Sequence, residues 1–292
     1  MSFSYVVAER ICYFLNRFPK VSVKNFMLAG ADKLSDNETL PKIVMKRCKT
    51  VRFIIDGFSV YKLSSKHKGY SSDRAVLFLP GGGGMARATW LHYDTASKIA
   101  EKSLADVYIA NYPLAPKYNV RYALKWLEKI YKHLLQKYSS ENITFIGDSA
   151  GANLILSLTY RSRIKPAKLF VISPACGLQN GCERNIRLAM EPFDPILSVK
   201  MNDIIADNWC RDVPMNSPDI SPEYIDYSGF PKIYLFCGSH ELFYPHVLNY
   251  IDILKKSNVS MKVYVKPMCH DWALCRFFPE GRKAVNIMSS LV

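Results

Sequence analysis

The sequence lacks several features that would assign it to a specialised class. It has no Cys-x-x-Cys pair, no internal repeat, no low-complexity tract and no apolar run of the about 18–20 residues that a membrane-spanning helix needs. Its eight cysteines are dispersed, which favours neither a zinc site nor a disulfide scaffold. The first residues also lack the cationic start, continuous apolar core and small-residue cleavage site of a secretory signal. We therefore expect a reduced, soluble, cytoplasmic protein.

Acidic residues are scarce relative to basic ones, with 25 Asp and Glu against 39 Lys and Arg and a net charge of +14. Residues 1–75 carry 14 Lys and Arg but only 6 Asp and Glu. Such a field attracts nucleic acid, an anionic membrane surface or acidic substrates. The basic residues are scattered, however, and none form the aromatic-interleaved motif that binds single strands. We expect a solvated basic surface and no nucleic-acid partner, with weak contact to an anionic membrane as the alternative.

Residues 3–18 place apolar side chains mostly three and four positions apart, with basic residues between and after them. This spacing predicts an amphipathic helix. Such a helix packs on the rest of the protein or lies on a membrane surface, and we favour packing.

From residue 50 onward the pattern alternates between short apolar runs and longer amphipathic ones. We expect strands at 51–56, 58–63, 74–80, 105–112, 143–147, 167–175, 232–238 and 261–267, and helices at 89–104, 120–138, from 150, at 245–258 and at 279–291. This order predicts an α/β fold in one domain, 1–292, with a mostly parallel sheet covered by helices on both faces. Residues 176–227 interrupt the alternation of strands and helices. We interpret them as an insertion between sheet strands, with a helix at 200–210.

The glycine-rich stretch at 80–85, PGGGGM, fits neither of the common phosphate-binding patterns. No Gly-Lys-Ser/Thr follows the glycines, and the dinucleotide fingerprint is not matched. Glycines at the end of a strand also let backbone N–H groups approach an anion, and a transition-state oxyanion is such an anion.

The segment from Gly147 to Gly151 matches Gly-x-Ser-x-Gly, follows a predicted strand and opens a predicted helix. A simple strand-to-helix turn would need only the glycines. The serine in this setting is typical of a nucleophile elbow, so we interpret Ser149 as a nucleophile.

A nucleophilic hydroxyl needs a base, and the base needs an orienting acid. His270 lies just past a predicted strand, and Glu241 is the carboxylate that follows the preceding strand. Active groups gather at the carboxyl ends of parallel strands, and the order Ser149, Glu241, His270 is that of α/β-hydrolases.

The sequence resembles the hormone-sensitive-lipase-like branch of the α/β-hydrolase fold. PGGGG stands where that family has His-Gly-Gly-Gly, and NYPLAPKYNVRYAL resembles its Tyr-Arg-Leu-Ala-Pro segment. GDSAGANL is nearly identical to the family's nucleophile-elbow sequence, and CGSHELF and CHDW resemble its acid and histidine loops. The matches run from about residue 75 to 275 in the family's order.

The resemblance implies Ser149 as nucleophile, His270 as general base and then acid, and Glu241 as the residue that holds its tautomer. It implies an oxyanion hole from the backbone N–H groups of Gly82, Gly83 and Ala150. It also implies a cap formed by about 1–45 and 176–227. Three positions depart from the family: Pro80 replaces its histidine, Glu241 its commoner aspartate, and Asn111 an aspartate.

The sequence therefore predicts a serine carboxylester hydrolase that acts on short- to medium-chain acyl esters through an acyl-enzyme and needs no metal or cofactor. An amidase or deacetylase with the same triad is one alternative, and a non-catalytic ligand-binding homologue is another. The physiological substrate and the oligomeric state are not specified by the sequence.

Overall fold

The computed structural model describes residues 1–18, 22, 24, 40–67, 69–178 and 181–292. The helices are α1 (Phe3–Leu15), α3 (Lys42–Arg47), α4 (Trp90–Ser103), α5 (Val120–Leu135), α6 (Ala150–Arg161), α7 (Cys182–Met190), α8 (Val199–Trp209), α9 (Tyr244–Lys256) and α10 (Pro279–Leu291). The strands are β1 (Cys48–Ile55), β2 (Phe58–Ser65), β3 (Ala75–Leu79), β4 (Asp106–Ala110), β5 (Ile143–Asp148), β6 (Lys168–Ile172), β7 (Lys232–Gly238) and β8 (Met261–Lys266).

In the described part of the chain the strands form one eight-stranded sheet in the order β1-β2-β4-β3-β5-β6-β7-β8. All neighbours from β4 to β8 are parallel, whereas β2 runs antiparallel to both β1 and β4. The prediction of a mostly parallel sheet is confirmed, with a hairpin at one edge. The hairpin turns at Asp56 and Gly57, whose positive φ angles of 49° and 85° suit a two-residue turn.

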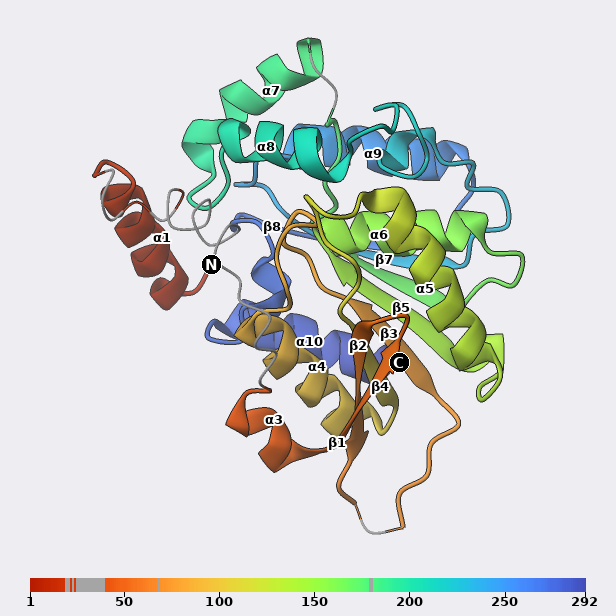
Figure 1. Cartoon of the computed structure of the whole chain (residues 1–292). Helices are drawn as coiled ribbons and strands as arrows, with labels where there is room; N and C mark the ends of the chain where they lie inside the picture. Colours follow the sequence, from red (N-terminus) through yellow and green to blue (C-terminus); the bar gives the residue numbers. More distant parts are fainter. Residues whose placement is uncertain (19–21, 23, 25–39, 68, 179–180) are drawn as a thin grey trace.

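Helices cover both faces of the sheet: α4 and α10 lie on one side, and α5, α6 and α9 on the other (Figure 1). Strands β3, β4 and β5 are buried along their whole length, because they lie in the middle of the sheet between these layers. This double burial explains why their sequences are continuous apolar runs instead of alternating ones.

Most predicted elements are confirmed to within a few residues, and the exceptions are short or terminal. Helix α1 ends at Leu15 and not at residue 18, while α3 and α7 were not predicted. With 6 and 9 residues, they are too short to produce a clear apolar period. None of the described helices combines the length and apolar character that crossing a membrane requires.

The two segments assigned to a cap occupy different places. Helices α7 and α8 lie beyond the carboxyl end of the sheet, and α1 stands at the periphery beside them (Figure 1). The end of the first segment belongs to α3, which contacts α4 and β1 instead.

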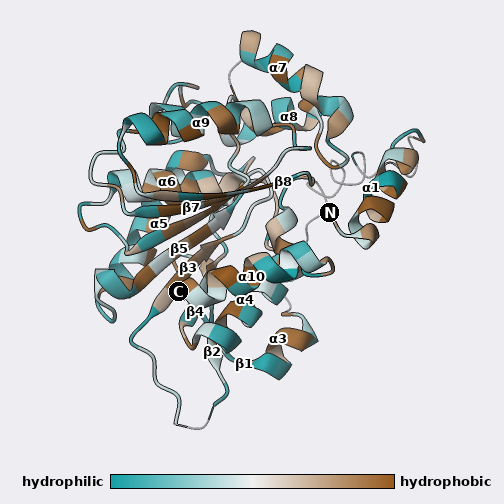
Figure 2. Cartoon of the chain, turned by 180° about the vertical axis from the view of Figure 1, so that it is seen from behind, coloured by the Kyte–Doolittle hydropathy of each residue, from teal (hydrophilic) through white to brown (hydrophobic). Residues whose placement is uncertain are grey.

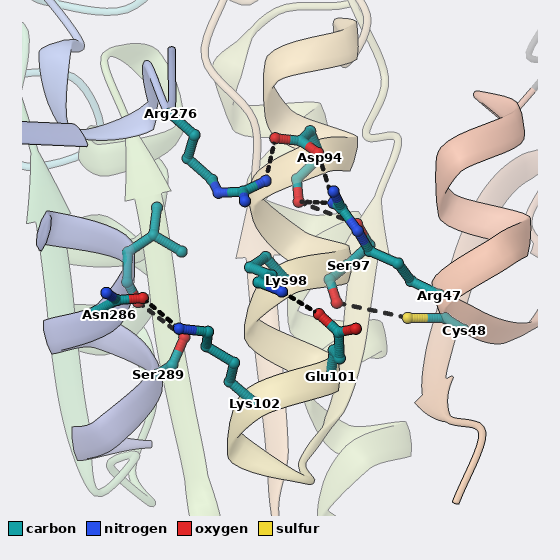
Figure 3. A network of polar contacts seen from close by, with 11 residues as sticks. Arg47, Cys48, Asp94, Ser97, Lys98, Glu101, Lys102, Arg276, Asn286 and Ser289 are labelled. Carbon is teal, nitrogen blue, oxygen red and sulfur yellow. Dashed lines mark hydrogen bonds and ion pairs between the residues drawn. The ribbon is translucent and has the colours of Figure 1, made fainter. Parts of the chain in front are cut away.

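The buried carboxylate of Asp94 on α4 links α3 to the segment that follows β8. Asp94 is 4% exposed and accepts hydrogen bonds from Arg47 at the end of α3 and from Arg276, as Figure 3 shows. Arg276 follows His270 by only six residues. Asp94 therefore anchors the far end of the segment that carries His270.

We expect Asp94→Asn to destabilise the fold by about 2–3 kcal/mol, because two mostly buried guanidinium groups, of Arg47 and Arg276, lose the charge of the carboxylate that they share. The matched control is Glu101→Gln, which removes the ion pair with Lys98 on the same helix. That pair is more exposed, so its loss should cost less than about 1 kcal/mol. Urea unfolding measures both, and equal effects of the two substitutions would contradict this role for Asp94.

Candidate active site

The residues singled out in the sequence come together at the carboxyl ends of four strands. The glycine-rich loop follows β3, Ser149 follows β5, Glu241 follows β7 and His270 follows β8. Adjacent parallel strands end at one edge of a sheet, and this places distant parts of the sequence around one cavity.

Ser149 occupies a strained turn between β5 and α6. Its φ of 50° and ψ of −121° are unfavourable for a residue with a side chain. The turn is tight because Gly151 approaches the backbone at the end of β3 so closely that a Cβ would overlap the carbonyl oxygens of Leu79 and Pro80. Ser149 itself is partly exposed and lines the cavity.

His270 and Glu241 are in contact and buried, at 5% and 0% exposure. The Nδ1 atom of His270 lies 3.0 Å from Oε2 of Glu241, and the other carboxylate oxygen accepts from the backbone N–H of Gly238 at 3.3 Å. With Nδ1–H donating to Glu241, the lone pair of a neutral imidazole resides on Nε2. That Nε2 atom is buried without a hydrogen-bond partner, and His270 lines the same cavity as Ser149.

The loops that carry these two residues are joined through their backbones. Ser239 donates to the carbonyl of Lys266 at 2.8 Å, and His240 donates to that of Met268 at 3.1 Å. The distance between the acid and the histidine is therefore set by main-chain hydrogen bonds as well as by the side chains.

The glycine-rich loop is held without a histidine at position 80. The carbonyl of Pro80 accepts a hydrogen bond of 2.7 Å from the hydroxyl of Tyr112, and the N–H of Gly81 donates to Oδ2 of Asp148 at 3.0 Å. Gly82 and Gly83 have φ angles of +100° and +64° and line the cavity. Pro80 thus takes part in the loop through its backbone carbonyl.

His92 has a role that the sequence analysis did not identify. It is buried in α4, and its Nε2 lies 3.0 Å from Oδ2 of Asp148, the residue before Ser149. Its Nδ1 accepts from the N–H of Thr89 at 2.8 Å, so Nε2 is the protonated nitrogen. Burial lowers the pKa of His92, but the negative charge of Asp148 outweighs it and the net shift is upward. Only the fold shows that α4 brings His92 to the elbow.

Asp194 is a second functional candidate that the sequence did not reveal. This carboxylate is fully buried and accepts from the backbone N–H groups of Ile196 and Leu197 at 2.8 Å and of Leu242 at 2.7 Å. It ties the segment between α7 and α8 to the residue after Glu241. Burial raises its pKa despite these donors.

Asp271 lies against the nitrogen of His270 that faces the cavity. Its Oδ2 is 3.3 Å from Nε2, and its Oδ1 is buried without a hydrogen-bond partner. Burial alone would lower the pKa of His270, but the carboxylates of Asp271, Glu241 and Asp194 raise it well above its ordinary value of 6.5. Burial also raises the pKa of Asp271, although His270 opposes the shift.

Two further histidines, His240 and His246, contact carboxylates outside the cavity. His240 Nδ1 lies 2.9 Å from Oε1 of Glu9 on α1, and His246 Nδ1 lies 2.8 Å from Oε2 of Glu183 on α7. Neither of these residues lines the cavity beside Ser149.

The cavity has a volume of about 550 Å³ and a largely apolar lining. Helix α8 closes one side: Ile205 packs against Gly83, and the ring of Trp209 packs against Gly84. Other apolar lining residues are Met85, Leu91, Val120, Leu154, Leu178, Ile196, Leu197, Met201, Ile204, Ile220, Leu242, Phe243 and Leu274.

The family model described as the alpha/beta hydrolase fold matches residues 76–274. An esterase of Acinetobacter venetianus is 25% identical over 225 residues, which is 74% of this chain and 73% of the relative. A carboxylesterase/phospholipase of Mycobacterium tuberculosis is 33% identical over 112 residues, covering 37% of this chain and 30% of the relative. The crystal structure of an esterase from the bacterial hormone-sensitive lipase family superposes with a TM-score of 0.80 at 20% identity, over 100% of this chain and 97% of that one.

The chain belongs to the α/β-hydrolase fold family, so the predicted fold class is confirmed. The resemblance to hormone-sensitive-lipase-like esterases is also confirmed, and the chain is a carboxylesterase- or lipase-like hydrolase.

The position of Asp271 predicts how activity depends on pH. A neutral His270 is needed to accept a proton, and a pKa raised above 6.5 places the acid limb of the kcat/KM profile above that pH. Asp271→Asn removes one negative charge beside Nε2 and should move this limb down by about one pH unit. The substitution suits the backbone, since asparagine tolerates the positive φ of 56° at this position.

Asp252→Asn is the control, because Asp252 lies on α9, pairs with Lys255 and does not line the cavity. Its profile should match that of the wild type. An unchanged acid limb in Asp271→Asn would show that Asp271 does not control the protonation of His270.

Proposed function

We propose that the protein hydrolyses carboxylic esters with Ser149 as nucleophile, His270 as general base and then acid, and Glu241 as the residue that orients His270. The observation that carries the proposal is the 3.0 Å contact between His270 Nδ1 and Glu241 Oε2, in a histidine that lines the same cavity as Ser149 and whose Nε2 is 3.3 Å from Asp271 Oδ2. In its neutral form, with Nδ1–H donating to Glu241, such a histidine can accept the serine proton on Nε2.

The oxyanion hole in this proposal consists of the backbone N–H groups of Gly82, Gly83 and Ala150. Ala150 is the first residue of α6, so its N–H points out of the helix's N-terminus, where the dipole adds positive potential. The anchoring of Pro80 and Gly81 supports the proposal because an oxyanion hole must be preorganised.

The reaction follows from these roles. The Ser149 oxygen attacks the ester carbonyl while its proton passes to Nε2 of His270, and the tetrahedral oxyanion receives hydrogen bonds from the three N–H groups. The C–O bond then breaks, His270 protonates the leaving alcohol, and an acyl-enzyme remains. Water attacks in the reverse sequence and releases the carboxylic acid, and Ser149 recovers its proton.

We propose short- to medium-chain acyl esters as substrates. The apolar lining favours an acyl chain, and a cavity of about 550 Å³ that α8 closes on one side limits its length. The cap in this proposal includes α8, which lies in the expected segment 176–227 and contacts the glycine-rich loop. The described residues of the other expected segment, about 1–45, do not line the cavity. No metal or cofactor enters the proposed steps.

Ser149→Ala should abolish the hydrolysis of nitrophenyl esters, tested as a series from acetate to dodecanoate. Removal of the nucleophile lowers kcat by roughly four to six orders of magnitude in serine hydrolases. The wild type should act best on the shorter half of the series. Equal rates in both proteins would contradict the assignment of Ser149, and faster cleavage of matched anilides than of esters would favour an amidase.

Glu241→Gln should lower kcat by roughly 10⁴-fold, as loss of the orienting carboxylate does in other triads. Glu241 accepts hydrogen bonds from both His270 and Gly238, and a glutamine oxygen can accept from only one of these donors. The control is Glu128→Gln, which loses a surface pair with Arg161 and should keep full activity. A small loss in Glu241→Gln would mean that another group orients His270.

A further inference from the structure

One face of helix α1 is apolar and exposed to solvent. Phe3, Val7, Ile11 and Phe14, together with Phe18 just beyond the helix, are between 40% and 84% exposed. Their spacing of three and four residues puts them on one side of the helix. The two views agree that α1 stands at the edge of the molecule, and Figure 2 shows hydrophobic residues along it.

The opposite face of α1 is already in use. Tyr5 is 2% exposed, accepts from the N–H of Cys269 at 2.6 Å and donates to Glu9 at 2.7 Å. Glu9 also contacts His240. Cys269 immediately precedes His270, and His240 immediately precedes Glu241, so α1 is fixed to both loops. The exposed apolar stripe lies on the opposite face of α1.

The C-terminal end of α1 is hydrogen-bonded to the segment that precedes α8. Tyr13 donates to the carbonyl of Phe193, and Asn16 donates to that of Pro195 at 2.9 Å. Phe193 is itself 57% exposed and extends the apolar surface beyond α1.

The charged residues around this exposed apolar face of α1 indicate what kind of surface binds it. Arg10 and Arg17 are exposed between the apolar positions, and the only acidic residue of α1, Glu9, is turned inward with a side chain that is 9% exposed. A two-fold contact between copies would bring like-charged arginines together, whereas an anionic lipid surface would neutralise them. With 13 residues, α1 is too short to span a bilayer and suits a position in its interface.

We propose that α1 docks the protein on anionic lipid surfaces: Phe3, Val7, Ile11, Phe14 and Phe18 enter the interface, and Arg10 and Arg17 contact the lipid phosphates. This docking goes beyond the proposed ester hydrolysis and does not depend on it. The docked helix contacts the loops of Glu241 and His270, so the cavity remains fixed relative to the surface on which α1 lies.

The test is co-sedimentation of the full chain with phosphatidylcholine vesicles, with and without phosphatidylserine. We expect binding that requires phosphatidylserine and weakens as salt is added, because the arginine contacts are screened. The double variant Phe3→Ser/Phe14→Ser should bind at least about tenfold more weakly, since two large apolar side chains no longer enter the interface.

Leu248→Ser is the matched control, because Leu248 is an exposed apolar residue on α9, away from α1. It should bind like the wild type. Far-UV circular dichroism serves as the folding control for all variants, and Ser149→Ala should bind vesicles normally, which separates docking from catalysis.

Three outcomes would overturn the proposal: no sedimentation with phosphatidylserine vesicles at low salt, equal binding of the double variant, or sedimentation equilibrium showing a dimer that Phe3→Ser/Phe14→Ser dissociates. The last result would assign the stripe to contact between copies of the chain.

Discussion

The buried carboxylate of Asp148 is the contact on which the candidate site depends most. One of its oxygens accepts from the backbone of Gly81 and from His92, both at 3.0 Å. It therefore joins the glycine-rich loop after β3, the serine turn after β5 and helix α4 at one point. This junction sets the relative position of Ser149 and the proposed oxyanion donors. Ser149 and Ala150 lie within two residues of Asp148, and Gly82 and Gly83 lie within two residues of Gly81.

The same principle recurs around the acid and the histidine, where carboxylates and hydroxyls from distant segments bind backbone groups. Asp194 fixes the segment before α8 to Leu242, and Tyr5 of α1 binds the N–H of Cys269. These contacts connect the cavity wall and the N-terminal helix to the loops of Glu241 and His270. A substitution in α1 can therefore affect the site without touching the cavity.

The fold was largely predictable because its strands are short apolar runs separated by amphipathic helices. The order of Ser149, Glu241 and His270 could also be predicted, since a parallel sheet brings successive strand ends to one edge. The contacts of His92, Asp194 and Asp271 could not, because each depends on which helix or loop folds back onto the site. Sequence spacing carries no such information for a single buried polar residue.

Position 80 illustrates the same limit. The sequence shows that a proline replaces the family's histidine, but not that the carbonyl of Pro80 accepts a hydrogen bond from Tyr112, 32 residues away. Two neighbouring contacts, to Tyr112 and to Asp148, hold the loop where a histidine side chain is missing. Backbone anchoring of this kind leaves no recognisable motif.

The central claim is that Ser149 is the nucleophile, and covalent trapping tests it most directly. The protein would be incubated with a serine-reactive alkyl phosphonate, digested and analysed by mass spectrometry. We predict a single adduct on the peptide that contains Ser149, formed more slowly after Glu241→Gln. Modification of another residue, with Ser149 unlabelled, would contradict the account.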